Sequence, residues 1–150
     1  MRGFKMVEGE YEKNNGTILN LPRRGTPNSA GYDFYMPIDA TIPAGARVLV
    51  WSDVRAYMLP DEVLNVYPRS SLGVKGLILS NTIGVIDSDY YSNRNTGGNI
   101  GLTLWNTTDK PFELRKGDRV CQGIFGKYLI ADNDIPISQE RIGGMGSTKA

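Results

Sequence analysis

The sequence contains no histidine, and this absence excludes more chemistry than any single residue predicts. Without histidine there is no Ser-His-Asp or Cys-His catalytic arrangement, and no zinc or iron site with histidine ligands. Cys121 is the only cysteine, so the chain forms neither an internal disulfide nor a cysteine metal cluster. If the protein is an enzyme, we expect its base to be a carboxylate and any metal to be a hard ion such as Mg²⁺, bound through oxygens.

Long hydrophobic runs and an excess of one charge are also missing. No stretch reaches the ~20 apolar residues that a membrane span requires, and 17 basic residues nearly balance 16 acidic ones. A balanced charge gives no electrostatic footprint for nucleic acid or an anionic membrane. We expect a soluble, intracellular and cytoplasmic protein in which any anion site is local.

Helical periodicity is absent as well, whereas 18 glycines and 8 prolines are spread along the 150 residues. Short apolar stretches separated by turn residues favour an all-β barrel or jelly roll, and the length suits one compact domain. The clearest strand is 100–106, because Ile100, Leu102 and Leu104 alternate with other residues. The other main strands are expected at 30–35, 47–57 (irregular near 52–53), 62–67 and 119–125, and one helical turn at 70–75, capped by Ser70 or Ser71.

Residues 81–91 (NTIGVIDSDYY) form the stretch around which the rest of the chain is organised. Its apolar pair lies between Gly84 and Asp87, a pattern typical of a strand that ends in a tight turn. Such a turn holds a carboxylate still on a rigid sheet, with Asn81 and Tyr90 nearby. Taken alone, an aspartate in a turn more often bonds its own backbone, so the interpretation depends on the other motifs.

The strand pattern ends at about residue 132, and the chain finishes in a Gly-rich segment, 143–148 (GGMGST). A Gly-rich terminus is usually disordered. The alternative is a mobile lid, because backbone N–H groups and two hydroxyls in such a run can wrap a phosphate.

Five segments, in order, resemble the five motifs of the trimeric dUTP pyrophosphatases (dUTPases). They are residues 30–34 (AGYDF), 68–73 (PRSSLG), 81–90 (NTIGVIDSDY), 117–122 (GDRVCQ) and 141–148 (RIGGMGST). Each motif is weak alone, but five in order are highly specific, and the resemblance extends from about residue 17 onward.

The resemblance implies a jelly-roll or distorted β-barrel domain over residues 1–140, and a flexible arm over 141–150 that closes the active site. It implies hydrolysis of dUTP to dUMP and pyrophosphate with Mg²⁺, which keeps uracil out of DNA and supplies dUMP for thymidylate synthesis. It also implies a homotrimer whose active sites are shared between subunits.

On the family pattern, Asp87 is the carboxylate that orients and activates the attacking water. The uracil edge is read by the hairpin that precedes it, and the sequence-matched residues are Asn81, Gly84, Val85 and Ile86. Tyr90 corresponds to the ring that packs under the deoxyribose and leaves no room for a 2′-hydroxyl.

The phosphate contacts implied by the resemblance come from other segments. Arg69, Ser70 and Ser71 match the phosphate-binding segment, and Gln122 matches a phosphate-contacting glutamine. Without the other motifs, a helix cap with a surface arginine would be the better explanation of the first three residues. Gln122 could equally be a polar residue on an edge strand. Asp33 matches an acid that supports the strand and, through water, the Mg²⁺ region, while the ion itself is held mainly by the substrate's phosphates.

Four residues match the arm that closes over the β- and γ-phosphates: Arg141, Gly146, Ser147 and Thr148. The sequence departs from the family pattern at Met145, where an aromatic residue usually stacks on the uracil. It departs again at 91–99 (YSNRNTGGN), which is several residues longer than the usual link. The first departure is expected to weaken base stacking, and the second concerns the outer loop of the hairpin and its trimer contacts.

Two other interpretations are open. A dCTP deaminase, or a bifunctional deaminase–pyrophosphatase, resembles the same fold but needs an acid/base group, typically a glutamate, which residues 81–90 lack. A dUTPase-like binding module would instead use 91–99 to contact a regulatory protein partner.

Overall fold

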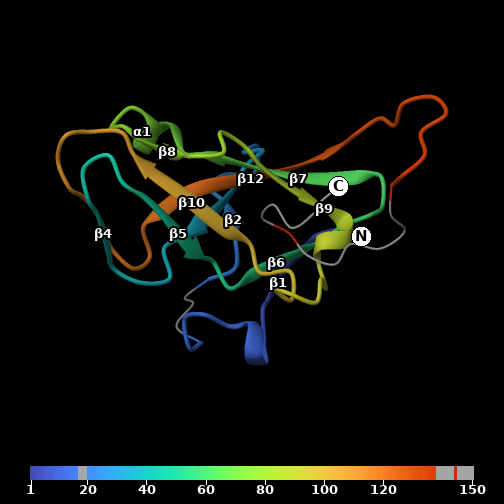
Figure 1. Ribbon diagram of the computed structural model, residues 1–150, viewed down its shortest axis with the longest axis horizontal. Helices are drawn as coiled ribbons and strands as arrows, with labels where there is room; N and C mark the ends of the chain where they lie inside the picture. Colours follow the sequence, from blue (N-terminus) through green and yellow to red (C-terminus); the bar gives the residue numbers. More distant parts are fainter. Residues whose placement is uncertain (17–19, 138–143, 145–150) are drawn as a thin grey trace.

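The computed structural model describes residues 1–16, 20–137 and 144, and these residues form an almost entirely β structure (Figure 1). The helical elements within them are short: η1 (Gly9–Tyr11), α1 (Ser70–Gly73) and η2 (Ser88–Tyr90). The strands are β1 (Gly3–Met6), β2 (Arg23–Arg24), β3 (Tyr32–Tyr35), β4 (Ala40–Ile42), β5 (Arg47–Trp51), β6 (Val54–Tyr57), β7 (Glu62–Pro68), β8 (Leu77–Leu79), β9 (Gly84–Asp87), β10 (Gly101–Asn106), β11 (Phe112–Leu114) and β12 (Arg119–Lys127). The predicted all-β fold of the jelly-roll type is confirmed. In the described part of the chain, no helix has the length and apolar character needed to cross a membrane.

Two sheets make up most of the body. The larger has the order β2-β3-β12-β7-β9 and the smaller the order β5-β10-β8, while β1-β6 and β11-β4 are two-stranded ribbons. The registered strand pairs are antiparallel. Strand β12 is central to the larger sheet, since it pairs with β3 on one side and with β7 on the other (Figure 1).

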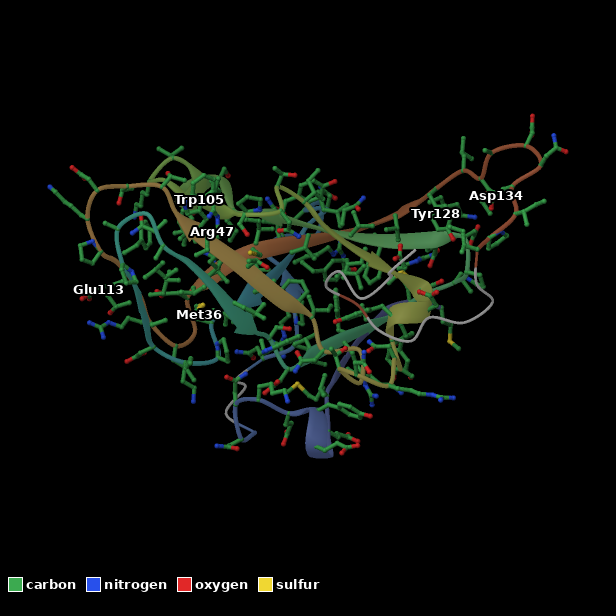
Figure 2. All side chains as sticks on the ribbon, viewed as in Figure 1. Met36, Arg47, Trp105, Glu113, Tyr128 and Asp134 are labelled. Atoms are coloured by element: carbon green, nitrogen blue, oxygen red, sulfur yellow. The ribbon has the colours of Figure 1, made fainter. Side chains whose placement is uncertain are left out.

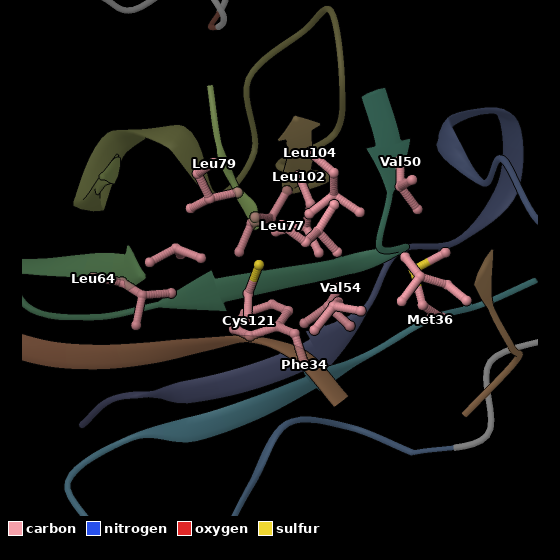
Figure 3. Close-up of a cluster of buried hydrophobic side chains, with 14 of the residues drawn as sticks. Phe34, Met36, Val50, Val54, Leu64, Leu77, Leu79, Leu102, Leu104 and Cys121 are labelled. Atoms are coloured by element: carbon pink, nitrogen blue, oxygen red, sulfur yellow. The ribbon is translucent and has the colours of Figure 1, made fainter. Parts of the chain in front are cut away.

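The core lies where side chains from these sheets meet (Figure 3). In β10 the burial alternates, and Leu102 and Leu104 are each 1% exposed, as the sequence pattern predicts. Phe34 and Leu64 contribute from the larger sheet. Burying an aliphatic or aromatic side chain of this size stabilises the fold by about 1.5–3 kcal/mol, so this shared core fixes the sheets that carry the candidate site.

The expected irregularity in 47–57 is real, and it divides the segment into β5 and β6. Asp53 lies at the break with a left-handed φ of 51°. Strand β5 pairs with β10, whereas β6 pairs with β1. One polar residue therefore sends the chain from one sheet to another.

Two local features differ from what the sequence indicated. Arg23 and Arg24 are exposed and form β2 against β3, outside the main strands expected from the sequence. The residue that caps α1 is Arg69, so neither Ser70 nor Ser71 is the N-cap.

Beyond β12, the chain up to residue 137 leaves the body, with Tyr128 and Asp134 along it (Figure 2).

Candidate active site

The first group of predicted site residues gathers on β9 and the turn before it, and we call Asn81, Gly84, Val85, Ile86 and Asp87 the hairpin cluster. Among the described residues, β9 is an edge strand with β7 as its neighbour in the sheet. An edge strand directs alternate backbone N–H and C=O groups away from the sheet. The outer edge of β9 therefore offers donors and acceptors in a fixed row, which suits recognition of a planar polar ligand.

Asn81 lies beside this strand. A Cβ added to Gly84 would lie 3.8 Å from Asn81 Nδ2 and 3.3 Å from the Cβ of Val66, so the glycine lets the amide and β7 approach the backbone closely. The turn that carries Asn81 is tight: Ile83 N donates to Asn81 O at 2.7 Å, and Thr82 has a φ of 63°. The structure thus brings Asn81 and the hairpin backbone together as predicted.

Asp87 is the last residue of β9, and η2 follows it directly. Its register partner on β7 is Val63. Tyr90, at the end of η2, is 5% exposed, and its hydroxyl donates to Asn99 O at 2.7 Å. A Cβ at Gly144 would overlap the ring of Tyr90, so one residue of the last motif lies against this ring.

A second group meets around Asp33 on β3. We call Asp33, Arg69, Arg119 and Gln122 the arginine cluster, of which all but Arg119 were predicted. Asp33 and Gln122 are register partners across β3 and β12. Arg69 Nε lies 3.0 Å from Asp33 Oδ1, and Arg119 NH1 lies 3.2 Å from Asp33 Oδ2. Because the Asp33 side chain is only 10% exposed, this ion pair fixes Arg69 more firmly than a surface contact would.

The side chain of Gln122 lies over Gly31. A Cβ added to Gly31 would overlap Oε1 of Gln122 and lie 3.1 Å from the Cβ of Gln122. The glycine of the AGYDF segment is thereby explained: it leaves room for the glutamine on the neighbouring strand. Ser70 and Ser71 are exposed at the start of α1, directly after Arg69.

Asp87 and Arg69 lie toward opposite ends of β7, although Gly84 of the hairpin cluster pairs with Val66, nearer the Arg69 end. Asp87 pairs with Val63 near the beginning of that strand, whereas Arg69 follows its last residue, Pro68. Six residues at about 3.3 Å each separate these positions by about 20 Å along the strand. Within one chain, Asp87 and Arg69 are thus too far apart to act on neighbouring groups of one phosphate chain.

The described residues offer little direct ligation for a metal ion. They include no group of three or more His, Cys, Asp or Glu residues that could hold one. Both oxygens of Asp33 contact guanidinium groups, and a divalent cation would be repelled by those charges at such short range. Asp33 does not fit as a direct ligand, and its predicted contact through water stays a prediction.

Cys121 is buried, and burial raises the pKa of its thiol to about 12, so it is not a nucleophile. Arg119 is the residue that sequence reasoning missed, although it lies within the fourth motif. The remaining predicted site residues lie outside the described part of the chain: Arg141, Met145, Gly146, Ser147 and Thr148.

The fold and the two clusters define a class: a jelly-roll protein with a polar edge strand next to a carboxylate, and a separate arginine centre for anions. Comparison with known proteins makes this specific. The dUTPase family model matches residues 18–149. The chain belongs to the dUTPase family.

Similar proteins match this chain over most or all of its length. The deoxyuridine 5′-triphosphate nucleotidohydrolase of Lactococcus lactis is 43% identical over 152 residues, covering 100% of this chain and 99% of the relative. That of Glaesserella parasuis is 40% identical, covering 83% and 81%. The crystal structure of a dUTPase from Streptococcus mutans superposes with a TM-score of 0.76 at 44% identity, covering 87% of this chain and 98% of that one. The dUTPase from phage phi11 of S. aureus shares the fold, with a TM-score of 0.70 at 15% identity over 92% and 97%.

Proposed function

We propose that the chain carries out the reaction of its family, the hydrolysis of dUTP to dUMP and pyrophosphate, with a water molecule held by Asp87 as the nucleophile. The observation that supports this proposal most directly is the position of Asp87 at the end of an edge strand. The backbone of that strand and the neighbouring Asn81 are placed to read a base. The uracil would bond to the outer edge of β9 and to Asn81. The sugar then lies toward Tyr90, and the α-phosphate toward Asp87.

Asp87 accepts a proton from the water as the water attacks the α-phosphorus, and the bond to the bridging oxygen of pyrophosphate breaks. The chain has no histidine to replace it in this role. A carboxylate held on a paired strand costs little reorganisation during the reaction, which favours catalysis.

The phosphates are bound by the arginine cluster. Asp33 engages the Nε atom of Arg69, so the terminal nitrogens of that guanidinium are directed to an anion, with the hydroxyls of Ser70 and Ser71 beside it. Gln122 adds a donor from β12. Mg²⁺, bound to the phosphate oxygens of the substrate, would neutralise part of their charge.

Since Asp87 and Arg69 of one chain lie about 20 Å apart along β7, each active site takes its hairpin from one chain and its arginine cluster from another. A homotrimer supplies three such sites. The arm, residues 141–150, would close over the bound nucleotide, and the contact between Gly144 and Tyr90 supports a place for it at the hairpin.

The reaction is tested by pyrophosphate release from dUTP, compared with dCTP, dTTP and UTP, with and without Mg²⁺. We expect release from dUTP alone at a high rate, and a strong loss when Mg²⁺ is chelated. Ammonia released from dCTP would instead identify a deaminase. A pull-down with and without residues 91–99 would reveal a regulatory protein partner.

A further inference from the structure

The segment 91–99 is a folded loop built around one buried amide. Asn93 is 3% exposed, and its Oδ1 accepts hydrogen bonds from Asn95 N at 3.1 Å and Thr96 N at 3.0 Å. Its Nδ2 donates to Thr96 Oγ1 at 2.7 Å and to Tyr90 O at 2.9 Å. The loop therefore turns the side chains of Asn93 and Thr96 inward onto Tyr90.

The end of the loop is tied to a second buried residue. Asn99 is 0% exposed, and its side chain bonds Asp53 in both directions: Nδ2 to Oδ1 at 2.6 Å, and Asp53 N to Oδ1 of Asn99 at 2.9 Å. Asp53 itself accepts further hydrogen bonds from Lys13 N and from the backbone and side chain of Asn14. The loop is thus anchored to the break between β5 and β6 and to the N-terminal segment.

Both ends of Tyr90 are held by this unit. Its hydroxyl donates to Asn99 O at 2.7 Å and accepts from Thr96 Oγ1 at 3.1 Å. Its carbonyl accepts from Asn93 Nδ2. Gly98 allows the loop to close, because it has a φ of 83° and a Cβ there would overlap the carbonyl of Tyr91.

We propose that Asn93, Thr96 and Asn99 are positioning residues that fix the ring of Tyr90, and that the preference for deoxyribose over ribose depends on them. The inference rests on the proposed function, since it concerns the sugar of the same substrate. A ring excludes a 2′-hydroxyl by overlap only while it cannot move away. A ring held at its hydroxyl and at its backbone meets that condition, whereas a loosened ring gives way to the extra oxygen.

The test compares Thr96→Val, which removes the hydroxyl while keeping the shape, with Thr96→Ser, which keeps the hydroxyl. Calorimetry gives the Kd of the non-hydrolysable α,β-imido analogues of dUTP and UTP, and the ratio of the two Kd values is the readout. We expect Thr96→Val to reduce the preference for the deoxy analogue about fivefold, the effect of one neutral hydrogen bond. Thr96→Ser should stay close to the wild type.

Asn14→Ala is the matched control, since Asn14 donates hydrogen bonds to Asp53 and to Trp51 O at the far side of the network. It should lower the Tm and leave the ratio unchanged. If Thr96→Val does not fold, Tyr90→Phe removes the same hydroxyl contacts and carries the same expectation.

An unchanged ratio in the folded Thr96→Val or Tyr90→Phe variant overturns the inference, and so does an equal shift in Asn14→Ala. A wild-type protein that binds both analogues equally also overturns it. Failure of wild-type protein to release pyrophosphate from dUTP sinks the proposed function instead, so the two failures are distinguishable.

Discussion

In the proposed function, the hairpin cluster and the arginine cluster would reach their ligand by different physical means. The hairpin cluster lies on an edge strand, where Val85 is 59% exposed and the backbone itself supplies the donors and acceptors. The arginine cluster lies on β3 and β12 and at the end of β7, inside the same sheet, and acts through side-chain charge held by Asp33. A base needs directional hydrogen bonds and a triphosphate needs fixed positive charge, so one sheet serves both by using its edge for the first and its interior for the second.

The largest expected effect is at the hairpin cluster. Asp87→Asn keeps the size of the side chain but cannot accept the proton of the water, so we expect kcat to fall by at least ~10²-fold with the Kd for the substrate analogue nearly unchanged. Steady-state kinetics and calorimetry check this. Asp89→Asn, two residues on at an exposed position, is the control and should retain most of its turnover. Full turnover in Asp87→Asn would remove Asp87 from the reaction.

A change in the arginine cluster should act mainly on binding. Arg69→Ala removes the guanidinium that Asp33 orients, and we expect KM for dUTP to rise about tenfold or more, the effect of a lost charge-assisted hydrogen bond. Arg119→Ala is the matched control, because it also breaks a contact with Asp33 but leaves Arg69 in place. Equal effects in the two variants would mean that the cluster as a whole, rather than Arg69, meets the phosphates.

A smaller effect is expected at Gly31. Its Cβ position overlaps Oε1 of Gln122, so Gly31→Ala should push the glutamine aside and raise KM a few-fold without lowering the Tm much. Gly126→Ala on the same sheet is the control, since a Cβ there meets nothing within 4 Å. If KM is unchanged in Gly31→Ala, the position of Gln122 does not matter to the phosphates.

The smallest effect on activity is expected at Glu62, the first residue of β7. Hydrogen bonds from Arg2 and from Leu59 N–H lower the pKa of Glu62 from its ordinary 4.5 to about 2. A carboxyl group whose pKa is lower in the folded state than in the unfolded state stabilises the fold at any pH above its unfolded-state pKa. This stabilisation is lost as the pH falls toward the folded-state pKa. The wild type should therefore lose stability between about pH 4.5 and pH 2.

Glu62→Gln should flatten that part of the curve of Tm against pH, while leaving kcat at neutral pH unchanged. Asp61→Asn, at an exposed pair with Lys127, is the control and should change the curve less. An identical curve for Glu62→Gln and wild type would show that the contact with Arg2 does not stabilise the fold.

Much of the fold and part of the candidate site were predictable from the sequence. The alternation of Ile100, Leu102 and Leu104 predicted a strand and its buried face, because burial in a sheet follows a period of two residues. The irregularity near Asp53 was also predicted, since a polar residue interrupts the apolar alternation. The motifs correctly grouped Asn81 with the hairpin backbone around Gly84.

Other features depend on long-range contacts that leave no local pattern. Strand β2 consists of two arginines and forms because β3 offers it a free edge, so no local pattern predicted it. Arg119 became visible as a partner of Asp33 only once β3 and β12 were paired. The inward hydrogen bonds of Asn93 and Asn99 join residues up to 88 positions apart, a distance over which sequence alone gives no signal.

The separation of Asp87 and Arg69 along β7 leads to the central claim, that one active site combines the hairpin of one chain with the arginine cluster of another. The most direct measurement co-expresses Asp87→Asn and Arg69→Ala chains with two different affinity tags and purifies the mixed assemblies through both tags. At a dUTP concentration well below KM, Asp87→Asn chains alone are nearly inactive, and Arg69→Ala chains alone keep about a tenth of the wild-type rate. In a mixed trimer one site in three pairs an intact hairpin with an intact arginine cluster, so we predict about a third of the wild-type rate. Mixed assemblies no more active than the single variants would contradict the account, because both clusters would then have to come from the same chain.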